Sequence, residues 1–206
     1  MAITSRTFRV VGQRIPKVDA LGKVTGQAVF GADVKLPGML VGKLLRSPYA
    51  HAHIKGIDTS KAEVLPGVMA VATARDMPEN PPGTRVPYGG ASTFDMYHLS
   101  QQILARDKVL FHSHPVAAVA AVSEEVAAEA LRLINVEYEI LPPVLNPLKA
   151  MNVNAALLHS DQHTQSLRGV SAAPSNVALH IELERGNVDS GFAESDVVVE
   201  RTFKTG

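Results

Sequence analysis

The stretch VAAVAAVSEEVAAEALRLINVEYEI, residues 116–140, predicts a strand, a helix and a second strand in direct succession. Residues 116–122 form an unbroken apolar run that has the length of a buried strand. Ser123 is a favourable N-cap, and Glu124 and Glu125 place negative charge at the positive end of the helix dipole. The succession favours a right-handed β-α-β unit in the fold.

The helix and the second strand carry different periodicities. Apolar residues between positions 126 and 134 recur at helical spacing, which predicts one face packed on a core. Residues 136–140 alternate between apolar and polar, and Pro142 and the proline after it end this strand. Glu137 and Glu139 therefore fit the solvated face of the strand better than a catalytic carboxylate pair.

Toward the N-terminus the pattern indicates short strands separated by turns. The predicted strands are residues 28–34, 39–46, 53–57 and 68–73. The apolar positions of 39–46 suggest a strand covered on both faces. Residues 58–63 predict one helical turn capped by Asp58 or Thr59. Residues 1–19 are polar and irregular, and we expect them to run as an arm over the surface.

Two segments are predicted to be irregular. Residues 78–100 are rich in proline and glycine and poor in aliphatic residues, which is typical of a long irregular loop that is either functional or disordered. Residues 160–175 are polar and suggest a boundary between domains. Beyond it, strands are predicted at 177–184 and 196–203, with a turn and the start of a helix at 186–192.

Short motifs follow one another in a fixed order along nearly the whole chain. They are Gly12–Asp19, Lys23–Gly26, Leu36–Leu40, Leu45–His53, Leu65–Val68, Thr73–Asp76, His114–Ala118, Val136–Pro142, Gly186–Asp189 and Ala193–Glu200. In this order and at these spacings the sequence resembles the start of the large, molybdopterin-binding subunit of the xanthine dehydrogenase and aldehyde oxidase family. Ser113 is a departure, because many relatives have glycine in this turn.

The resemblance implies a fold of the α/β class, of mixed α+β type, whose main unit is an α/β-hammerhead domain over residues 20–150. Residues 1–19 would form an N-terminal arm and residues 151–175 a linker. Residues 176–206 would be the first strands of the molybdopterin-binding domain, truncated here. The order of strands and helices derived above agrees with this division.

The resemblance also implies what the complete enzyme does. Family members hydroxylate an aldehyde or an N-heterocycle, and relatives oxidise carbon monoxide or reduce a hydroxybenzoyl thioester. The complete enzyme is expected to use molybdopterin cytosine dinucleotide, [2Fe-2S] clusters and FAD on other domains or subunits. Its partners would be the remainder of the molybdopterin-binding subunit and the iron–sulfur and FAD subunits. In the family the catalytic and cofactor-binding residues lie beyond the equivalent of Gly206, so we expect none in this chain.

An alternative is a non-catalytic interaction or assembly module that retains the hammerhead fold.

Under either interpretation, the composition excludes several kinds of ligand and partner. The chain has no cysteine, so it cannot ligate an iron–sulfur cluster through thiolates. Its net charge of +0 provides no basic surplus for nucleic acid. The longest apolar run, Pro115–Val122, is too short to cross a bilayer, and we expect a cytoplasmic protein without membrane insertion.

The candidate site residues lie in the predicted loop 78–100. In the family the corresponding segment approaches the substrate entrance, and Tyr88, Phe94, Met96 and Tyr97 bring apolar surface to it. The hypothesis is that Phe94 and Tyr97 line a substrate funnel. The alternative is that both side chains fix the loop to its own domain.

Two histidine pairs have a spacing that could in principle serve a metal. His51 and His53, like His112 and His114, are two residues apart and would share a side of a strand. No thiol or carboxylate ligand is close to the first pair in sequence. The sequence therefore favours hydrogen-bonded or half-exposed imidazoles and predicts no metal site.

Overall fold

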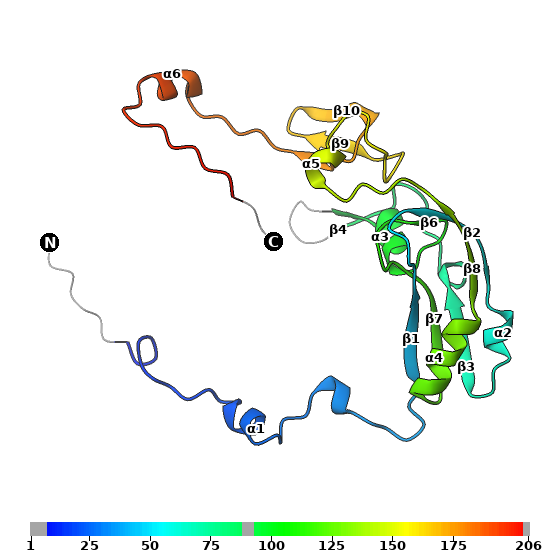
Figure 1. Cartoon of the computed structure of the whole chain (residues 1–206). Coiled ribbons are helices and arrows are strands. Elements are labelled where there is room, and N and C mark those ends of the chain that lie inside the picture. Colours follow the sequence, from blue (N-terminus) through cyan, green and yellow to red (C-terminus); the bar gives the residue numbers. More distant parts are fainter. Residues whose placement is uncertain (1–7, 88–92, 204–206) are drawn as a thin grey trace.

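The computed structural model describes residues 8–87 and 93–203. Most of its regular structure lies in a central body, residues 41–140 (Figure 1). The strands of this body are β1 (Val41–Arg46), β2 (Ala52–Asp58), β3 (Val68–Thr73), β4 (Arg85–Pro87), β5 (Thr93–Asp95), β6 (Lys108–Val109), β7 (Pro115–Ala121) and β8 (Asn135–Ile140). Its helices are α2 (Ser60–Glu63), the 3₁₀ turn η2 (Ala74–Asp76), α3 (Met96–Ile103) and α4 (Glu124–Leu133).

Two antiparallel three-stranded sheets form the centre of this body. The first has the order β1-β7-β3, with Leu45 opposite Ala117. The second has the order β6-β2-β8, with Ile54 opposite Tyr138. The prediction of strands 53–57 and 136–140 is confirmed, and β3 has the predicted bounds.

The predicted order of strand, helix and strand is confirmed, but its geometry is different. β7 and β8 belong to separate sheets, so they do not form a β-α-β unit within one sheet. β7 has both edges filled by β1 and β3, which fits its unbroken apolar sequence. β8 is an edge strand, and its exposed Glu137 and Glu139 confirm the solvated face.

Helix α4 covers the first sheet and completes the main core. The predicted N-cap is confirmed, because Ser123 Oγ accepts a hydrogen bond of 3.3 Å from the Val126 N–H. The buried residues of this core are Ala62, Ala117, Val119, Ala121, Ala127, Ala130 and Ile134. Alanine dominates the set, which lets the helix approach the sheet closely. A smaller core of Ala52, Ala105, Val109 and Val116 lies beside β2 and β6.

Two predictions for the N-terminal strands are wrong. Residues 28–34 contain only the 3₁₀ turn η1 (Gly31–Asp33), which follows α1 (Ala20–Val24). Asp33 Oδ2 accepts the Phe30 N–H at 2.9 Å, and this local hydrogen bond competes with an extended conformation. β1 alternates between half-buried and exposed residues, so only one of its faces is covered.

The segment 78–100 is more regular than predicted. β4 pairs antiparallel with β5, and α3 follows at once because Asp95 caps it by accepting from the Tyr97 N–H at 3.0 Å. Asp95 is a capping signal that the proline-rich composition obscures. Tyr88 lies outside the described residues.

The segment after β8 also differs from the prediction. Residues 160–175 are not irregular, because β9 (His163–Ser166) and β10 (Gly169–Pro174) pair there, after α5 (Pro147–Ala150). The predicted strand 177–184 shrinks to β11 (Leu179–His180), and 196–203 is not a strand. The predicted helix start is confirmed as α6 (Val188–Ala193), capped by Asn187. The domain boundary itself remains a prediction.

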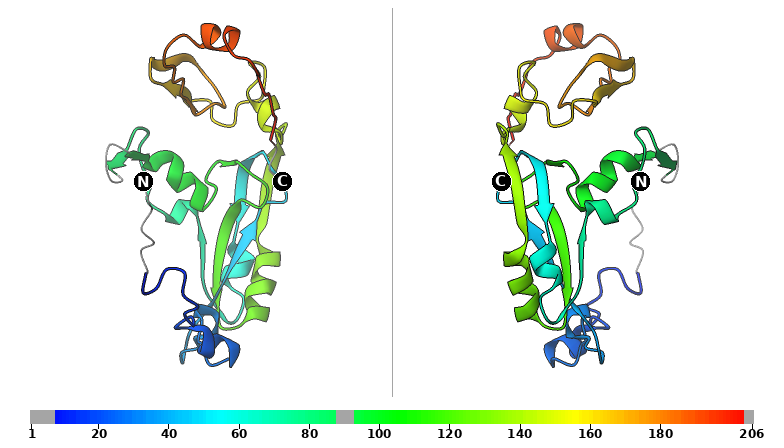
Figure 2. Two further views of the ribbon diagram at one scale, coloured as in Figure 1. Left: turned by 90° about the vertical axis from the view of Figure 1, so that its left-hand side faces the viewer. Right: turned by 90° about the vertical axis from the view of Figure 1, so that its right-hand side faces the viewer.

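Burial divides the molecule sharply. All residues that are buried, among those the structure describes, lie between Ser47 and Ile134. Residues 8–40 extend from one end of the central body, and β9–β11 with α6 lie at its other end (Figures 1 and 2). Within residues 8–87 and 93–203, no helix is both long and apolar enough to cross a membrane.

Candidate functional site

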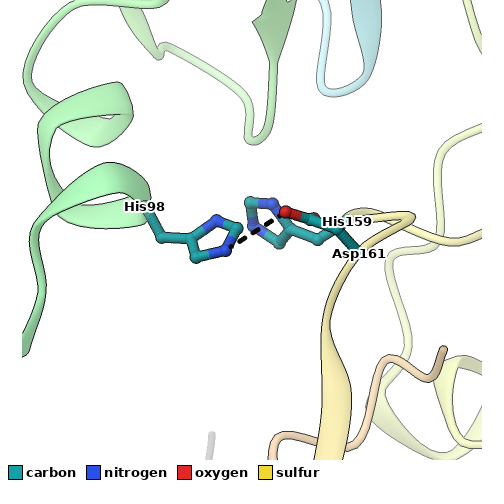
Figure 3. Close-up of side chains that lie close together, drawn as sticks. All are labelled: His98, His159 and Asp161. Atoms are coloured by element: carbon teal, nitrogen blue, oxygen red, sulfur yellow. Dashed lines mark ion pairs between the residues drawn. The ribbon is translucent and has the colours of Figure 1, made fainter. Parts of the chain in front are cut away.

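The candidate site lies where α3 meets the chain that leads into β9. Asp95 Oδ1 accepts the backbone N–H groups of Tyr97 at 3.0 Å and of His98 at 3.4 Å. This cap fixes the first turn of α3. His98 therefore projects from a constrained helix terminus toward residues 159–161 (Figure 3).

The opposite side of the site is held by Asn176. Its Nδ2 donates to the carbonyls of Ala150 at 3.2 Å and Ala156 at 3.0 Å. Its Oδ1 accepts the Leu158 N–H at 2.9 Å. Because one side chain holds three backbone groups, the loop before His159 has a defined path.

His98, His159 and Asp161 form a cluster of possible metal ligands (Figure 3). One ligand atom from each residue lies within 4.8 Å of the others. His98 Nε2 is 3.5 Å from Asp161 Oδ2. The two imidazole rings meet edge to face, with centroids 4.9 Å apart and planes at 80°.

Burial sets the electrostatics of this cluster. The pKa of His159 is lowered mainly by burial and further by His98. Burial also lowers the pKa of Lys108 on β6, while Asp161 acts in the opposite direction. His98 Nδ1 is buried and has no hydrogen-bond partner in the described part of the chain.

Sequence reasoning missed this cluster. His98 is far in sequence from His159 and Asp161, and only the fold brings them together. The spacing of His159 and Asp161 is a local signal, since they are two residues apart like the histidines of the other two pairs. Such a pair becomes informative only when a third ligand is known.

The two predicted funnel residues occupy different environments. Phe94 lies on β5 opposite Val86, and its side chain is 44% exposed. Tyr97 is half-buried in the first turn of α3, and its ring centroid is 4.9 Å from that of His98. Tyr97 therefore lies next to His98 of the cluster. Phe94 is an exposed apolar residue three positions earlier in the sequence.

The interpretation of the paired histidines as hydrogen-bonded side chains fits the structure. His51 Nδ1 is 2.9 Å from the Pro142 carbonyl oxygen. His114 is fully buried, and its Nδ1 accepts the Leu110 N–H at 3.2 Å. His112 Nδ1 is 3.0 Å from Ser113 Oγ.

Ser113 occupies a backbone conformation that favours glycine. Its φ is +65°, and it is the only non-glycine residue with positive φ in the described part of the chain. A left-handed conformation costs a residue with a Cβ about 1–2 kcal/mol. A glycine at this position would adopt the turn without that cost, whereas serine adopts it with strain.

A cavity of about 340 Å³ lies between the central body and the segment after β8. It is mainly apolar and is lined by residues such as His51, Phe111, Leu158 and Asn176. Its lining includes no lysine or arginine, the side chains that best bind a pyrophosphate. This cavity therefore does not fit a molybdopterin dinucleotide, and the cysteine-free sequence does not fit a thiolate-bound iron–sulfur cluster.

Comparison with known proteins identifies the central body. Residues 25–142 match the family described as aldehyde oxidase and xanthine dehydrogenase, a/b hammerhead domain. The body is thus an α/β-hammerhead domain. The chain belongs to the aldehyde oxidase and xanthine dehydrogenase family and corresponds to the N-terminal part of the large subunit.

Curated relatives agree with this assignment. A probable xanthine dehydrogenase subunit of Bacillus subtilis is 38% identical over 90% of this chain. The carbon monoxide dehydrogenase large chain of Afipia carboxidovorans is 39% identical over 94%. The chain spans only 22% and 23% of these two relatives.

Two solved structures support the same fold. The reconstituted CO dehydrogenase from Oligotropha carboxidovorans has a TM-score of 0.69 and 37% identity, covering 90% of this chain and 22% of that chain. The aldehyde oxidoreductase from Desulfovibrio gigas has a TM-score of 0.59 and 30% identity, covering 71% of this chain and 16% of that one.

Proposed function

We propose that the chain is the structural N-terminal part of a molybdenum hydroxylase large subunit and provides no catalytic residue of its own. This proposal is supported mainly by one observation: the residues that match the family model include all of the buried residues that the structure describes. The match covers residues 25–142, and every buried residue described lies within that range. The part of the chain that folds around its own core therefore lies within the domain that the family model describes.

The complete enzyme, in this proposal, hydroxylates an aldehyde or an N-heterocycle, or acts as a carbon monoxide dehydrogenase-like or hydroxybenzoyl-thioester reductase-like enzyme. It uses molybdopterin cytosine dinucleotide on the remainder of the large subunit, and [2Fe-2S] clusters and FAD on other subunits or domains. The relatives, one named as a subunit and one as a large chain, support a multi-subunit assembly. The proposal includes the cytoplasmic location expected from the sequence.

Exposed apolar side chains near the C-terminus support the proposal that another polypeptide covers this segment. Leu183 is 84% exposed, Val197 77% and Phe203 91%. Apolar side chains in such density are usually covered by protein. We propose that residues 176–203 begin the molybdopterin-binding domain and that the remainder of the large subunit covers them.

Reconstitution tests this proposal. The chain is mixed with a polypeptide that supplies the remainder of a large subunit, and complex formation and oxidation of an aldehyde or N-heterocycle are measured. We expect a one-to-one complex, with molybdenum and turnover in the complex and neither in the chain alone. One molybdenum per isolated chain after desalting, or turnover by that chain, would overturn the proposal.

A matched pair of substitutions locates the contact. Val198→Asp introduces charge into the exposed C-terminal segment, where Val198 is 58% exposed. Val64→Asp is the control, because Val64 is 80% exposed and follows α2, at the opposite end of the body from β9–β11 (Figure 1). Assembly should be lost in the first variant and retained in the second.

The funnel role of Phe94 and Tyr97 remains part of the proposal. Phe94→Ala in the reconstituted enzyme should change the ratio of kcat/KM between bulky and small substrates. Phe111→Ala is the control, because Phe111 has the same 44% exposure but stacks on His114 at a centroid distance of 4.2 Å. If Phe94→Ala leaves the ratio unchanged and lowers only Tm, the side chain merely fixes the loop.

A further inference from the structure

We propose that His98, His159 and Asp161 bind one divalent transition-metal ion, and that zinc is the ion best suited to them. The ion would connect the first turn of α3 to the chain leading into β9. The proposal concerns residues of this chain alone and does not depend on the activity of the complete enzyme.

The ligand set has the right chemistry. Two imidazole nitrogens and one carboxylate oxygen are a common donor set of zinc sites that keep a fourth position for water. Ligand atoms on tetrahedral zinc, at about 2.0–2.1 Å from the metal, lie roughly 3.3 Å from one another. His98 Nε2 and Asp161 Oδ2 are already 3.5 Å apart.

The third ligand requires only a small adjustment. All three ligand atoms lie within 4.8 Å of one another, so closing onto an ion needs side-chain movements of about 1–2 Å. Asp161 is 52% exposed at its side chain and can turn. His98, at 13% exposure, is held by packing and provides the fixed point.

The surroundings favour ligation over a simple ion pair. The 3.5 Å separation of His98 Nε2 and Asp161 Oδ2 is long for a charge-assisted hydrogen bond, which is usually about 2.7–2.9 Å. His98 Nδ1 has no hydrogen-bond partner in the part of the chain described, so the polar contacts of this ring concentrate on Nε2. The protein alone therefore leaves the buried Nδ1 atom of this partly buried imidazole without a hydrogen bond.

A neighbouring positive charge opposes metal binding. The ammonium group of Lys108 interacts electrostatically with Asp161, one of the three proposed ligands. Removing that charge should therefore strengthen metal binding, an effect that a purely structural cluster would not show.

Calorimetric titration with zinc chloride tests the proposal on the full, tag-free chain after dialysis against EDTA. We expect one zinc ion per chain and a rise in Tm on binding. Cobalt(II) should give the visible absorption of a tetrahedral site. His98→Ala and Asp161→Asn should each weaken zinc binding by at least about tenfold.

Two further variants make the result specific. Lys108→Gln should tighten zinc binding. His180→Ala should leave it unchanged, because His180 is exposed on β11 and outside the cluster. If His98→Ala does not fold, Asp161→Asn decides, since its half-exposed side chain can be replaced without disturbing packing. The proposal is overturned if wild type binds no zinc saturably, or if Asp161→Asn binds it as tightly as wild type.

Discussion

The central body and the C-terminal segment both contain valine-rich runs, yet they use them differently. Val119 of β7 is 2% exposed, while Val198 is 58% exposed. β7 has a strand on each edge and α4 over the sheet, whereas residues 196–203 have no strand partner in the described chain. An apolar run becomes core only where neighbouring elements cover it.

Replacing a glycine by alanine should give the largest difference in stability loss between the central body and the C-terminal segment. Gly67 has φ +92°, and a Cβ there would lie 2.9 Å from Val122 Cγ2. Gly67→Ala should therefore destabilise by about 3 kcal/mol, from left-handed strain and overpacking together. Gly186 has φ +80° in open space, so Gly186→Ala should cost at most about 1 kcal/mol.

Urea unfolding measures both glycine variants. An equal decrease in the free energy of unfolding for Gly67→Ala and Gly186→Ala would contradict this expected difference. That result would place residues around Gly186 in an environment as closely packed as the turn before β3.

Truncating valine should give the next largest difference. Val119→Ala removes two buried methyl groups and should cost about 2 kcal/mol, including the cavity left behind. Val198→Ala should change stability by less than about 0.5 kcal/mol in the isolated chain. Thermal and urea unfolding report both, and a large loss for Val198→Ala would show that its segment is already covered.

Acidification should weaken the central body through His114. Burial lowers the pKa of His114 below its ordinary value of 6.5. Above pH 6.5 both the folded and unfolded chains keep this ring neutral, so its contribution is fully present. Below that pH the unfolded chain takes up a proton that the folded chain resists, and stability falls until the pH passes the folded-state pKa.

His114→Gln tests this pH dependence. Its free energy of unfolding should fall less than that of wild type between pH 6.5 and lower pH. The substitution His180→Ala, at an exposed position, should leave the wild-type slope unchanged. An identical slope in His114→Gln and wild type would rule out this contribution.

The turn at Ser113 should give the smallest effect. Ser113→Gly relieves left-handed strain but increases the entropy of the unfolded chain, so the net gain should be about 1 kcal/mol or less. Ser113→Ala keeps the Cβ and should give no gain. Denaturation midpoints measured side by side distinguish the two, and equal stabilisation by alanine would remove strain as the cause.

Sequence reasoning succeeded where the local signal and the tertiary environment agreed. The cap at Ser123, the helical stripe after it and the alternation of 136–140 all appear as predicted. Pairing was harder, because hydrogen bonds between strands depend on distant partners. β7 and β8 are adjacent in sequence and still belong to different sheets.

The candidate site was predictable only in part. The sequence identified Tyr97, which lies beside His98 in the structure. It could not identify the cluster with His159 and Asp161, because the loop that carries them is positioned by hydrogen bonds that Asn176 accepts from Leu158 and donates to Ala156. Those bonds form only after the chain has folded back on itself.

Hydrogen exchange on the isolated chain, read residue by residue, tests the central claim most directly. We predict slow exchange in the hydrogen-bonded strands and helices of residues 41–140 and fast exchange in 176–203. Protection of 176–203 should appear only when the remainder of a large subunit is added. Uniformly slow exchange through Phe203 in a monomer would contradict the account and favour a self-contained, non-catalytic module.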